Sequence, residues 1–249
     1  TVRHRLPAAT FGETWKTALT LEQVAAPFDL ILLDAYGVLN IGETPIEGAA
    51  ERIRALRNAG KAVSVVSNSA GYPKSRMMRR YARLGYDFAP SEVVTSREAL
   101  LTHLADAPRR RWGVMLDAGN GHDDLDGVDM TFLAGDRISY DAAEGFLLIG
   151  ADGWTDARQA MLEASLREVP RPVCVGNPDI VAPRQSGLSR EPGHFAHRLA
   201  DATGIEPRFF GKPFGEIFGL ALSRRDPQPP PDRVLMVGDS LHTDVLGGR

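Results

Sequence analysis

The amino-acid sequence predicts an α/β protein, with a doubly wound parallel sheet as its core and a smaller α/β domain inserted into that core. Three observations lead to this prediction. Short aliphatic and β-branched runs alternate with amphipathic helical patterns that end in glycine, which is typical of βα units. The alternation restarts near Trp112. Polar residues also follow several apolar runs directly, as at the ligand-binding edge of a parallel sheet.

The first block of elements begins with a strand predicted at Phe28–Leu33. A helix is expected over Glu47–Ala59, because its apolar residues recur on one helical face and Gly60 supplies a stop signal. The other elements expected in this block are a strand at Ala62–Val66, a helix from Pro73 to Leu84, a strand at Val93–Val94 and a helix capped by Thr95 or Ser96.

The second block contains three predicted strands and one clear helix. The strands are Trp112–Leu116, Phe146–Ile149 and Val173–Val175, and the helix is Asp156–Arg167. The pattern of the first block then returns with Phe209–Phe210, a helix through Leu222 and the strand Val234–Val237. We therefore predict that residues 1–97 and 207–249 form the core domain and that residues 98–206 form the inserted domain.

The composition is that of a globular protein. The 249 residues include 29 basic and 32 acidic side chains, which are spread along the chain and give a formal net charge of -3. This distribution predicts neither a nucleic-acid partner nor a membrane partner. The single cysteine, Cys174, lies in an apolar run, where we expect a buried and inert thiol. Without an export signal or a membrane anchor in the sequence, we expect a soluble cytoplasmic protein, and a homodimer stays open.

The polar residues at the predicted strand ends form a consistent chemical set. Asp34 follows the first strand, Ser67 the second, Lys212 the short strand at Phe209–Phe210, and Asp239 the last strand. In a parallel sheet these ends meet at one edge. Two carboxylates with a hydroxyl and an ammonium suit phosphoryl transfer, with Asp34 as nucleophile and Mg²⁺ held between carboxylates.

Each residue type has a physical reason to be at this edge. Asp34 is expected to stay ionised beside a cation and a lysine, so that a carboxylate oxygen can attack phosphorus. Gly37 permits a sharp turn that points backbone N–H groups at phosphoryl oxygens. Ser67 and the N–H group of Asn68 can hold another oxygen, and Lys212 offers positive charge to the phosphate.

The segment Gly238-Asp239-Ser240-Leu241-His242-Thr243-Asp244 is the most specific motif in the chain. Two acidic residues at one strand-to-helix turn exceed what helix capping requires, and Asp239 is expected to complete the magnesium site. His242 is expected to be an exposed helix residue. The acidic stretch Asp117–Asp126 lacks the ligand pattern of a calcium loop and is interpreted as a solvated loop.

The order of these motifs resembles the haloacid dehalogenase superfamily of hydrolases with an aspartate nucleophile. The long segment between Ser67 and Lys212 matches the class IIA branch, in which an α/β cap domain is inserted at this point. The resemblance implies a magnesium-dependent phosphatase that acts on small phosphorylated substrates. It also implies that Asp244 belongs to the metal motif, and that Asn177 and Asp179 in the cap contact the substrate.

The chain departs from the pattern of this superfamily at Tyr36. Phosphatases of the superfamily have a second aspartate here, which protonates the leaving group and then activates water, while its backbone carbonyl binds Mg²⁺. Tyr36 can still supply that carbonyl. A phenol with a reference pKa of about 10 is a poor base at neutral pH, however, and general acid–base catalysis contributes about 10²–10⁴-fold. The sequence therefore predicts a slow enzyme or one with a relocated acid.

Two other hypotheses stay open. The string Asp34-Ala35-Tyr36-Gly37 also resembles the first motif of the 2-haloacid dehalogenases, which need neither magnesium nor a general acid for halide departure. The position of the inserted domain argues against that assignment. The third hypothesis is a catalytically impaired protein that binds phosphate ligands or acts as a regulator. The missing aspartate favours it, and the retained nucleophile, lysine and metal motif count against it.

Overall fold

The structure, a computed structural model, describes residues 2–12, 15–184 and 187–249. Contacts divide the chain into two compact units. The first unit comprises residues 1–67, 78–94 and 212–249, and the second comprises residues 68–77 and 95–211. Each unit contains its own parallel sheet with flanking helices, so the α/β class predicted from the sequence is confirmed. The two units are described separately below.

The first unit is built on a four-stranded sheet with the order β13-β1-β4-β5. Its strands are β1 (Leu30–Leu33), β4 (Ala62–Ser67), β5 (Val93–Thr95) and β13 (Val234–Val237). The central strand β1 pairs in parallel with both β13 and β4. All four residues of β1 are buried, as expected for a central parallel strand with helices on both faces.

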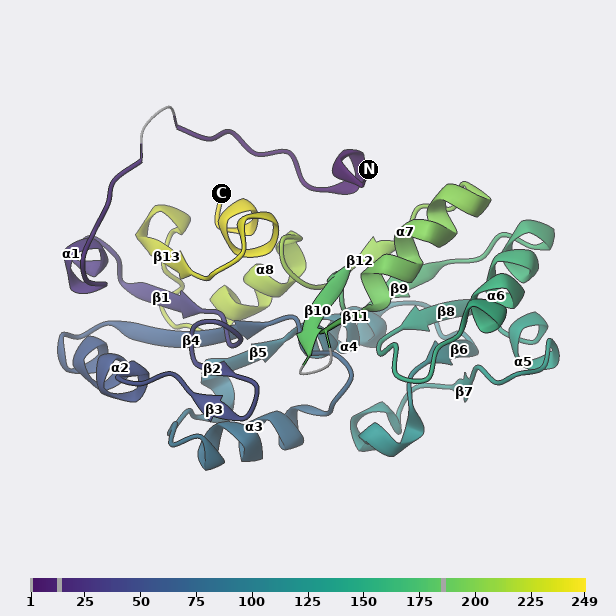
Figure 1. Cartoon of the computed structure of the whole chain (residues 1–249), viewed down its shortest axis with the longest axis horizontal. Helices are drawn as coiled ribbons and strands as arrows, with labels where there is room; N and C mark the ends of the chain where they lie inside the picture. The colour runs from purple at the N-terminus through teal and green to yellow at the C-terminus, as the bar shows by residue number, and fades with distance from the viewer. Residues whose placement is uncertain (1, 13–14, 185–186) are drawn as a thin grey trace. The chain divides into compact units, whose positions relative to one another are not determined.

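Helices cover both faces of this sheet, with α2 on one side and α8 on the other (Figure 1). The helices of this unit are α1 (Glu22–Ala25), α2 (Ala49–Asn58) and α8 (Gly215–Ser223), together with residues 78–83 of α3 (Lys74–Arg83). A small hairpin of β2 (Asn40–Ile41) and β3 (Thr44–Pro45) precedes α2. The sequence analysis did not predict this hairpin, because strands of two residues leave no periodic pattern.

The second unit contains a five-stranded parallel sheet with the order β12-β9-β8-β6-β7. Its strands are β6 (Trp112–Met115), β7 (Met130–Phe132), β8 (Gly145–Leu148), β9 (Val173–Val175) and β12 (Arg208–Phe209). The sequence analysis groups Phe209 with the core strands, but β12 pairs with β9 in this sheet. A two-residue strand does not reveal its partner in sequence, since pairing depends on distant residues.

The helices of the second unit include two that the sequence analysis missed, α5 (Ile138–Asp141) and α7 (Pro192–Thr203). They also include α4 (Ser96–Asp106) and α6 (Asp156–Glu168). The predicted cap of α4 is confirmed, because the Thr95 side chain accepts from the Glu98 N–H group in a capping box. Helix α7 was missed, although Pro192 at its start and Gly204 at its end are typical boundary residues.

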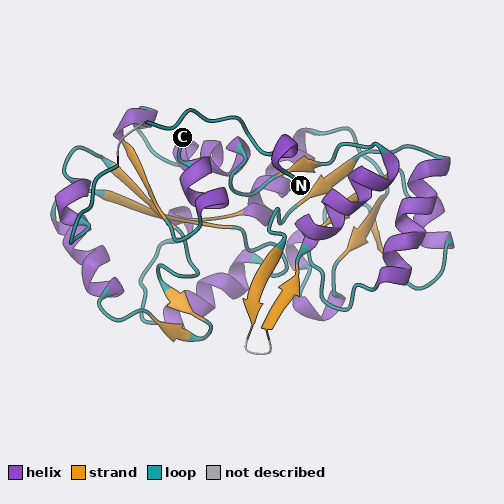
Figure 2. Cartoon of the chain, turned by 45° about the horizontal axis from the view of Figure 1, so that its top comes forward, coloured by secondary structure: helices purple, strands orange, loops and turns teal. Residues whose placement is uncertain are grey.

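An antiparallel hairpin completes the second unit. Strands β10 (Val181–Arg184) and β11 (Gly187–Arg190) pair with each other in a two-stranded sheet and extend from the β9–α7 connection (Figure 2). This hairpin directly follows the loop that carries Asn177 and Asp179.

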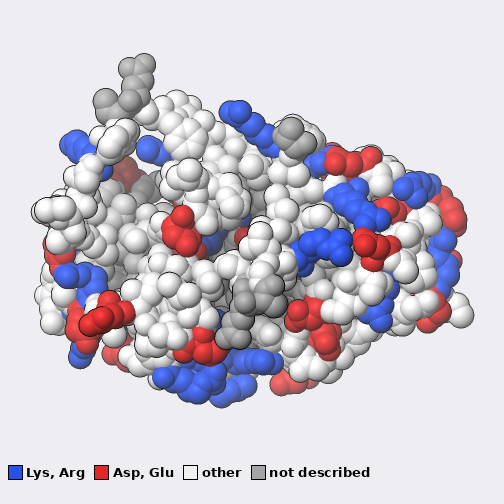
Figure 3. All heavy atoms as spheres, in the orientation of Figure 1, with Lys and Arg blue, Asp and Glu red and all other residues white. Residues whose placement is uncertain are grey.

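Charged side chains of both signs are interspersed on the face shown in Figure 3, with one group of basic residues over α3. The exposed members of that group are Arg76, Arg79 and Arg83. Arg80 and Arg83 of α3 form ion pairs with Glu43 at 3.0 and 3.8 Å. No helix among the described residues is long and apolar enough to cross a membrane.

Cys174 lies in β9 and is buried, as the sequence analysis expects. Burial raises the pKa of its thiol to about 11, so almost no reactive thiolate exists at neutral pH.

We predict that Cys174 does not react with an aromatic disulfide reagent in the native protein at pH 7.5, whereas the unfolded chain reacts with one equivalent. Absorbance of the released thiolate measures both states. Rapid stoichiometric labelling of the native protein would contradict this picture of the β9 core.

Candidate active site

The register of the first sheet brings the first and last motifs together. Leu33 in β1 lies opposite Val237 in β13, so the two parallel strands end level. The next residues are Asp34 and Gly238, and the Asp34 N–H group donates to the Val237 carbonyl at 2.9 Å. Asp239 follows one residue later. This pairing explains why two residues far apart in the chain share one edge of the sheet.

Lys212 connects two of the carboxylates in this cluster. Its side chain is almost fully buried, and its Nζ atom lies 2.6 Å from an oxygen of Asp34 and 2.6 Å from an oxygen of Asp244. A buried ammonium requires such partners, because an unpaired charge away from water is costly. The lysine therefore fixes the positions of both carboxylates.

Asp244 is held by the unusual turn that follows β13. Residues Leu241–Val245 form a single π-helical turn, and such turns are frequent at functional sites. The Asp244 carboxylate accepts from the Ser240 N–H group at 3.1 Å. A Cβ atom on Gly238 would lie 2.1 Å from the Asp244 carboxyl carbon, so only glycine allows this carboxylate to fold back over the strand end. His242 in the same turn is exposed, as expected.

Gly37 makes an equally close approach to Asp239. Its φ of +82° is unfavourable for other residues, and a Cβ atom there would lie 2.0 Å from an Asp239 carboxylate oxygen. The sequence analysis explains Gly37 by the turn alone. The structure adds a steric reason, since the Gly37 backbone forms the surface on which the Asp239 carboxylate rests.

The three carboxylates form a compact group. One oxygen from each of Asp34, Asp239 and Asp244 lies within 4.8 Å of the others. Among the described residues, these three side chains form a group that could bind a metal ion. Lys212 is the ammonium in contact with this cluster. Three carboxylates against one ammonium leave excess negative charge, and oxygen ligands of this kind suit Mg²⁺. The residues therefore fit a divalent cation.

The surroundings of Asp34 shift the pKa of its carboxyl group. Burial raises the pKa of its carboxyl above the ordinary value, the Lys212 ammonium opposes this rise, and the Asp244 carboxylate adds to it. The sequence analysis expects a lysine and a cation to keep Asp34 ionised. The net direction of the pKa shift is upward, so Lys212 does not cancel the effect of burial, and a bound divalent cation would favour the ionised carboxylate further.

Three other residues of the first unit lie near the strand ends. Tyr36 is 38% exposed and forms an isolated bridge with Asn40. Ser67 is buried at the end of β4, next to β1. Tyr81 of α3 is fully buried, and burial raises the pKa of its phenol well above the usual range, while the Ser67 side chain acts in the opposite direction. The sequence analysis missed Tyr81, because helical periodicity marks it as a core residue and does not reveal its polar neighbour.

The second unit contains the other predicted site residues. Asn68, Asn177 and Asp179 belong to one hydrogen-bonded group, in which the Asn68 side-chain amide donates to the Asp179 carboxylate at 2.8 Å. The side-chain oxygen of Asn177 accepts a hydrogen bond from the Asp179 N–H group at 2.9 Å. The sequence analysis assigned Asn68 and Asp179 to different motifs and did not foresee this contact, since it joins segments distant in sequence.

Arg97 is a second residue that the sequence analysis missed. Its buried guanidinium donates to the carbonyl of Ala70 at 3.1 Å and to Asp124 at 2.5 Å. Asp124 belongs to the acidic stretch interpreted as a solvated loop, and it pairs with this arginine. The loop after Ser67 is therefore tied down through Ala70. In sequence, Arg97 looks like any arginine in the first turn of a helix.

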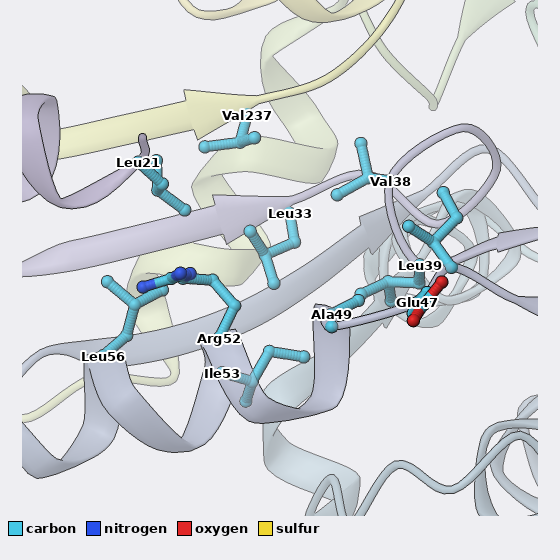
Figure 4. Close-up of a pocket in the computed structure, with 12 residues that line it drawn as sticks. Leu21, Leu33, Val38, Leu39, Glu47, Ala49, Arg52, Ile53, Leu56 and Val237 are labelled. Atoms are coloured by element: carbon cyan, nitrogen blue, oxygen red, sulfur yellow. The ribbon is translucent and has the colours of Figure 1, made fainter. Parts of the chain in front are cut away.

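The first unit also contains an apolar cavity of roughly 330 Å³ that none of the predicted site residues lines. Figure 4 shows Leu33 and Val38 on one wall and Ile53 and Leu56 of α2 on another. The cavity offers a mainly hydrocarbon surface, which does not suit a phosphate group. The carboxylate cluster is therefore the candidate site for polar chemistry in this unit.

The fold and this cluster define a class of α/β enzymes that carry an acidic metal-type site and a lysine at the carboxyl edge of a parallel sheet. Residues 31–130 match the family model described as haloacid dehalogenase-like hydrolase, and residues 209–249 match a second model described as HAD-hydrolase-like. The chain therefore belongs to the haloacid dehalogenase-like hydrolase family.

Curated relatives agree with this assignment. Human chronophin is 31% identical over 232 residues, which cover 88% of this chain and 76% of chronophin. The acid sugar phosphatase of Staphylococcus haemolyticus is 27% identical over 220 residues, with 87% and 80% coverage. The 4-nitrophenylphosphatase of Schizosaccharomyces pombe is 24% identical over 236 residues, with 88% and 78% coverage. The resemblance to the class IIA phosphatases is thus confirmed, and the chain is an enzyme of the phosphatase type.

Solved structures show the same fold. The haloacid dehalogenase-like hydrolase of Brucella suis is 27% identical, superposes with a TM-score of 0.74 and matches 92% of this chain and 84% of its own. The p-nitrophenyl phosphatase of Archaeoglobus fulgidus has a TM-score of 0.75 at 22% identity, with 89% and 82% coverage. The parallel-sheet architecture predicted from the sequence is that of this family.

The contact between Gly37 and Asp239 leads to a prediction with a matched control. Gly37→Ala and Gly85→Ala both place alanine at a positive φ, which costs about 1–2 kcal/mol of folding free energy. Only the Gly37 variant also forces a Cβ atom against Asp239, because nothing lies within 4 Å of the Cβ position at Gly85. We expect Gly37→Ala to weaken Mg²⁺ binding at least tenfold, as measured by Mg²⁺-dependent thermal shifts, and Gly85→Ala to leave it unchanged. Equal Mg²⁺ affinities in the two variants would contradict the steric argument.

Proposed function

We propose that the protein is a Mg²⁺-dependent hydrolase of small phosphate monoesters that forms an aspartyl-phosphate on Asp34. The observation that carries this proposal is the group of Asp34, Asp239 and Asp244 oxygens within 4.8 Å of one another beside the Lys212 ammonium. A nucleophilic carboxylate, a cation-binding pair and a fixed ammonium are the parts that phosphoryl transfer requires.

The reaction follows from these roles in two steps. A carboxylate oxygen of Asp34 attacks phosphorus, the ester P–O bond breaks, and the alcohol departs with a proton from solvent or from a nearby acid. Water then attacks the phosphorus of the aspartyl-phosphate, which releases inorganic phosphate and regenerates Asp34. When bound, Mg²⁺ would neutralise phosphoryl charge and favour the ionised form of Asp34. Asp34, Asp239, Asp244 and the Tyr36 carbonyl are the proposed groups that hold it.

The proposed phosphate contacts come from backbone and side-chain donors. Gly37, Ser67 and the Asn68 N–H group would hold phosphoryl oxygens, and Lys212 would balance negative charge on the phosphate and on Asp34. The position of Ser67 at the end of β4, the strand next to β1, supports this role, because it places the hydroxyl at the same edge of the sheet as Asp34.

We further propose that the inserted segment is the cap of this enzyme, with residues 98–206 as its approximate extent and Asn177 and Asp179 as its contribution to substrate binding. The separate five-stranded sheet supports an independent domain. Small phosphorylated molecules are the proposed substrates, and the names of the relatives support that class. The cytoplasm is the proposed compartment.

The dehalogenase hypothesis and the binding-protein hypothesis are separated by one experiment. A panel of small phosphate esters and 2-haloacids, assayed with and without Mg²⁺, distinguishes them by product. Phosphate release that requires Mg²⁺ supports the proposal, and halide release supports dehalogenation. Tight phosphate binding without turnover supports the impaired protein. The cluster of three carboxylates favours the first outcome, because halide displacement needs no cation.

Removal of the nucleophile or of the metal should abolish turnover. We expect Asp34→Asn to lower kcat by at least 10⁴-fold, since the amide is a poor nucleophile, while circular dichroism and thermal unfolding show an intact fold. Chelation of Mg²⁺ should have the same effect on the wild type and should be reversed by added Mg²⁺. Activity that survives both treatments would reject the mechanism.

Because Tyr36 stands where related phosphatases have an aspartate, we predict that Tyr36→Asp increases phosphatase activity. If proton transfer limits turnover, Tyr36→Asp restores a general acid and base, and kcat for 4-nitrophenyl phosphate and for a glycerol phosphate should rise. The alkyl ester should gain more, about 10²-fold, because its leaving group is more basic. Tyr36→Phe serves as the matched control, since it removes the phenol and adds no acid. An unchanged kcat in the aspartate variant would indicate a relocated acid or different chemistry.

A further inference from the structure

The carboxylate of Asp179 is engaged by a residue of the proposed phosphate loop. The Asn68 amide donates to it at 2.8 Å, and the two residues are 111 positions apart in the chain. Asn68 directly follows Ser67, and the residue is 7% exposed. Asp179 therefore meets the loop after β4 through a defined side-chain contact within the second unit.

The orientation of the Asn68 amide is fixed at both ends. Its nitrogen faces the Asp179 carboxylate. An ionised carboxylate accepts hydrogen bonds and cannot donate one. Its oxygen packs against Gly211, where a Cβ atom would lie only 2.5 Å from it. A rotated amide would place two acceptor oxygens against each other at 2.8 Å. The contact thus restricts both the rotamer of Asn68 and the backbone to which it is attached.

The loop that carries Asp179 is itself anchored. The Asn177 side chain accepts from the Asp179 N–H group at 2.9 Å and donates to the buried Glu191 carboxylate at 3.4 Å. Glu191 accepts in turn from the Ser189 hydroxyl at 2.5 Å. These bonds connect the loop to the β11 strand and to the start of α7.

Backbone contacts make the same anchor rigid. The Gly193 N–H group donates to the Asp179 carbonyl at 3.0 Å, and the Glu191 N–H group donates to the Ile180 carbonyl at 3.0 Å. The Gly193 Cα lies so close that a Cβ atom there would be 2.0 Å from the Pro178 carbonyl oxygen. The carboxylate of Asp179 therefore has a fixed position from which to hold Asn68.

We propose that Asp179 contributes to substrate binding as a positioning residue, which acts on the transferred phosphoryl group through Asn68 and does not contact the leaving group. This inference rests on the proposed function, in which the Asn68 N–H group holds a phosphoryl oxygen. By holding the side chain of Asn68, Asp179 sets the direction of that N–H group. Its contribution should then be the same for every phosphorylated ligand.

Inorganic phosphate provides the decisive ligand, because it has no leaving group. For Asp179→Ala, we expect the Kd of inorganic phosphate in Mg²⁺ buffer, measured by calorimetry, to rise roughly tenfold. The value of kcat/KM should fall by the same factor for 4-nitrophenyl phosphate and for a glycerol phosphate. For Asp179→Asn, whose neutral oxygen is a weaker acceptor, we expect a loss of about two- to threefold, again equal for all three ligands.

A matched pair in the same unit controls for the loss of a hydrogen bond alone. The Asn120 amide donates to the Asp152 carboxylate at 2.8 Å, the same chemistry and distance as in the pair of Asn68 and Asp179. Asp152→Ala should leave phosphate affinity and kcat/KM unchanged. Thermal unfolding of each variant separates any loss of stability from the loss of phosphate affinity, and Asp179→Asn carries the test if Asp179→Ala does not fold.

Two outcomes overturn the inference. An unchanged phosphate Kd in both Asp179 variants would reject it, as would a loss confined to one ester, which indicates a leaving-group contact. Failure of the proposed function is recognised separately. A wild-type protein that binds phosphate but hydrolyses no ester would refute the phosphatase mechanism, while the phosphate Kd values would still decide the role of Asp179. A wild-type protein that binds no phosphate would overturn both.

Discussion

The contact of one buried ammonium with two carboxylates organises the first unit. Lys212 is buried with its ammonium against Asp34 and Asp244, and these two contacts hold the carboxylates on either side of it. Removal of one partner from such a buried pair costs on the order of 3–5 kcal/mol. The carboxylate of Asp239 adds negative charge that Lys212 cannot balance alone, and this excess is what makes the cluster suited to a divalent cation.

Much of the fold follows from local patterns. The strands β1, β4, β6, β8, β9 and β13 and the helices α2, α3, α6 and α8 were predicted within a few residues of their observed bounds, because each has a clear period or an apolar run. The two hairpins, β7, α1, α5 and α7 were not predicted. The strands among them are short or exposed, and their formation depends on partners elsewhere in the chain rather than on periodicity.

The site could be predicted only in part for a related reason. Asp34 and Asp239 follow β1 and β13, whose parallel pairing brings them together, and Asp244 stands in the turn after β13. Lys212 follows β12, which pairs in the other sheet, so its contact with these carboxylates could not be derived from sheet order. The contact of Asn68 with Asp179 and the buried position of Arg97 depend on side-chain packing between distant segments, which no single stretch of sequence encodes. The upward effect of burial on the pKa of Asp34 could not be foreseen, because the degree of burial is invisible in sequence.

The level ends of β1 and β13 restrict where this chain can tolerate changes in length. Each residue of a strand advances the backbone by about 3.3 Å and turns its side chain to the opposite face. One residue added to or deleted from either strand would therefore separate Asp34 from Asp239 and break the paired register of Leu33 with Val237. Insertions between β4 and α8 leave that register untouched, so a whole folded unit can be accommodated there while the carboxylate cluster is preserved.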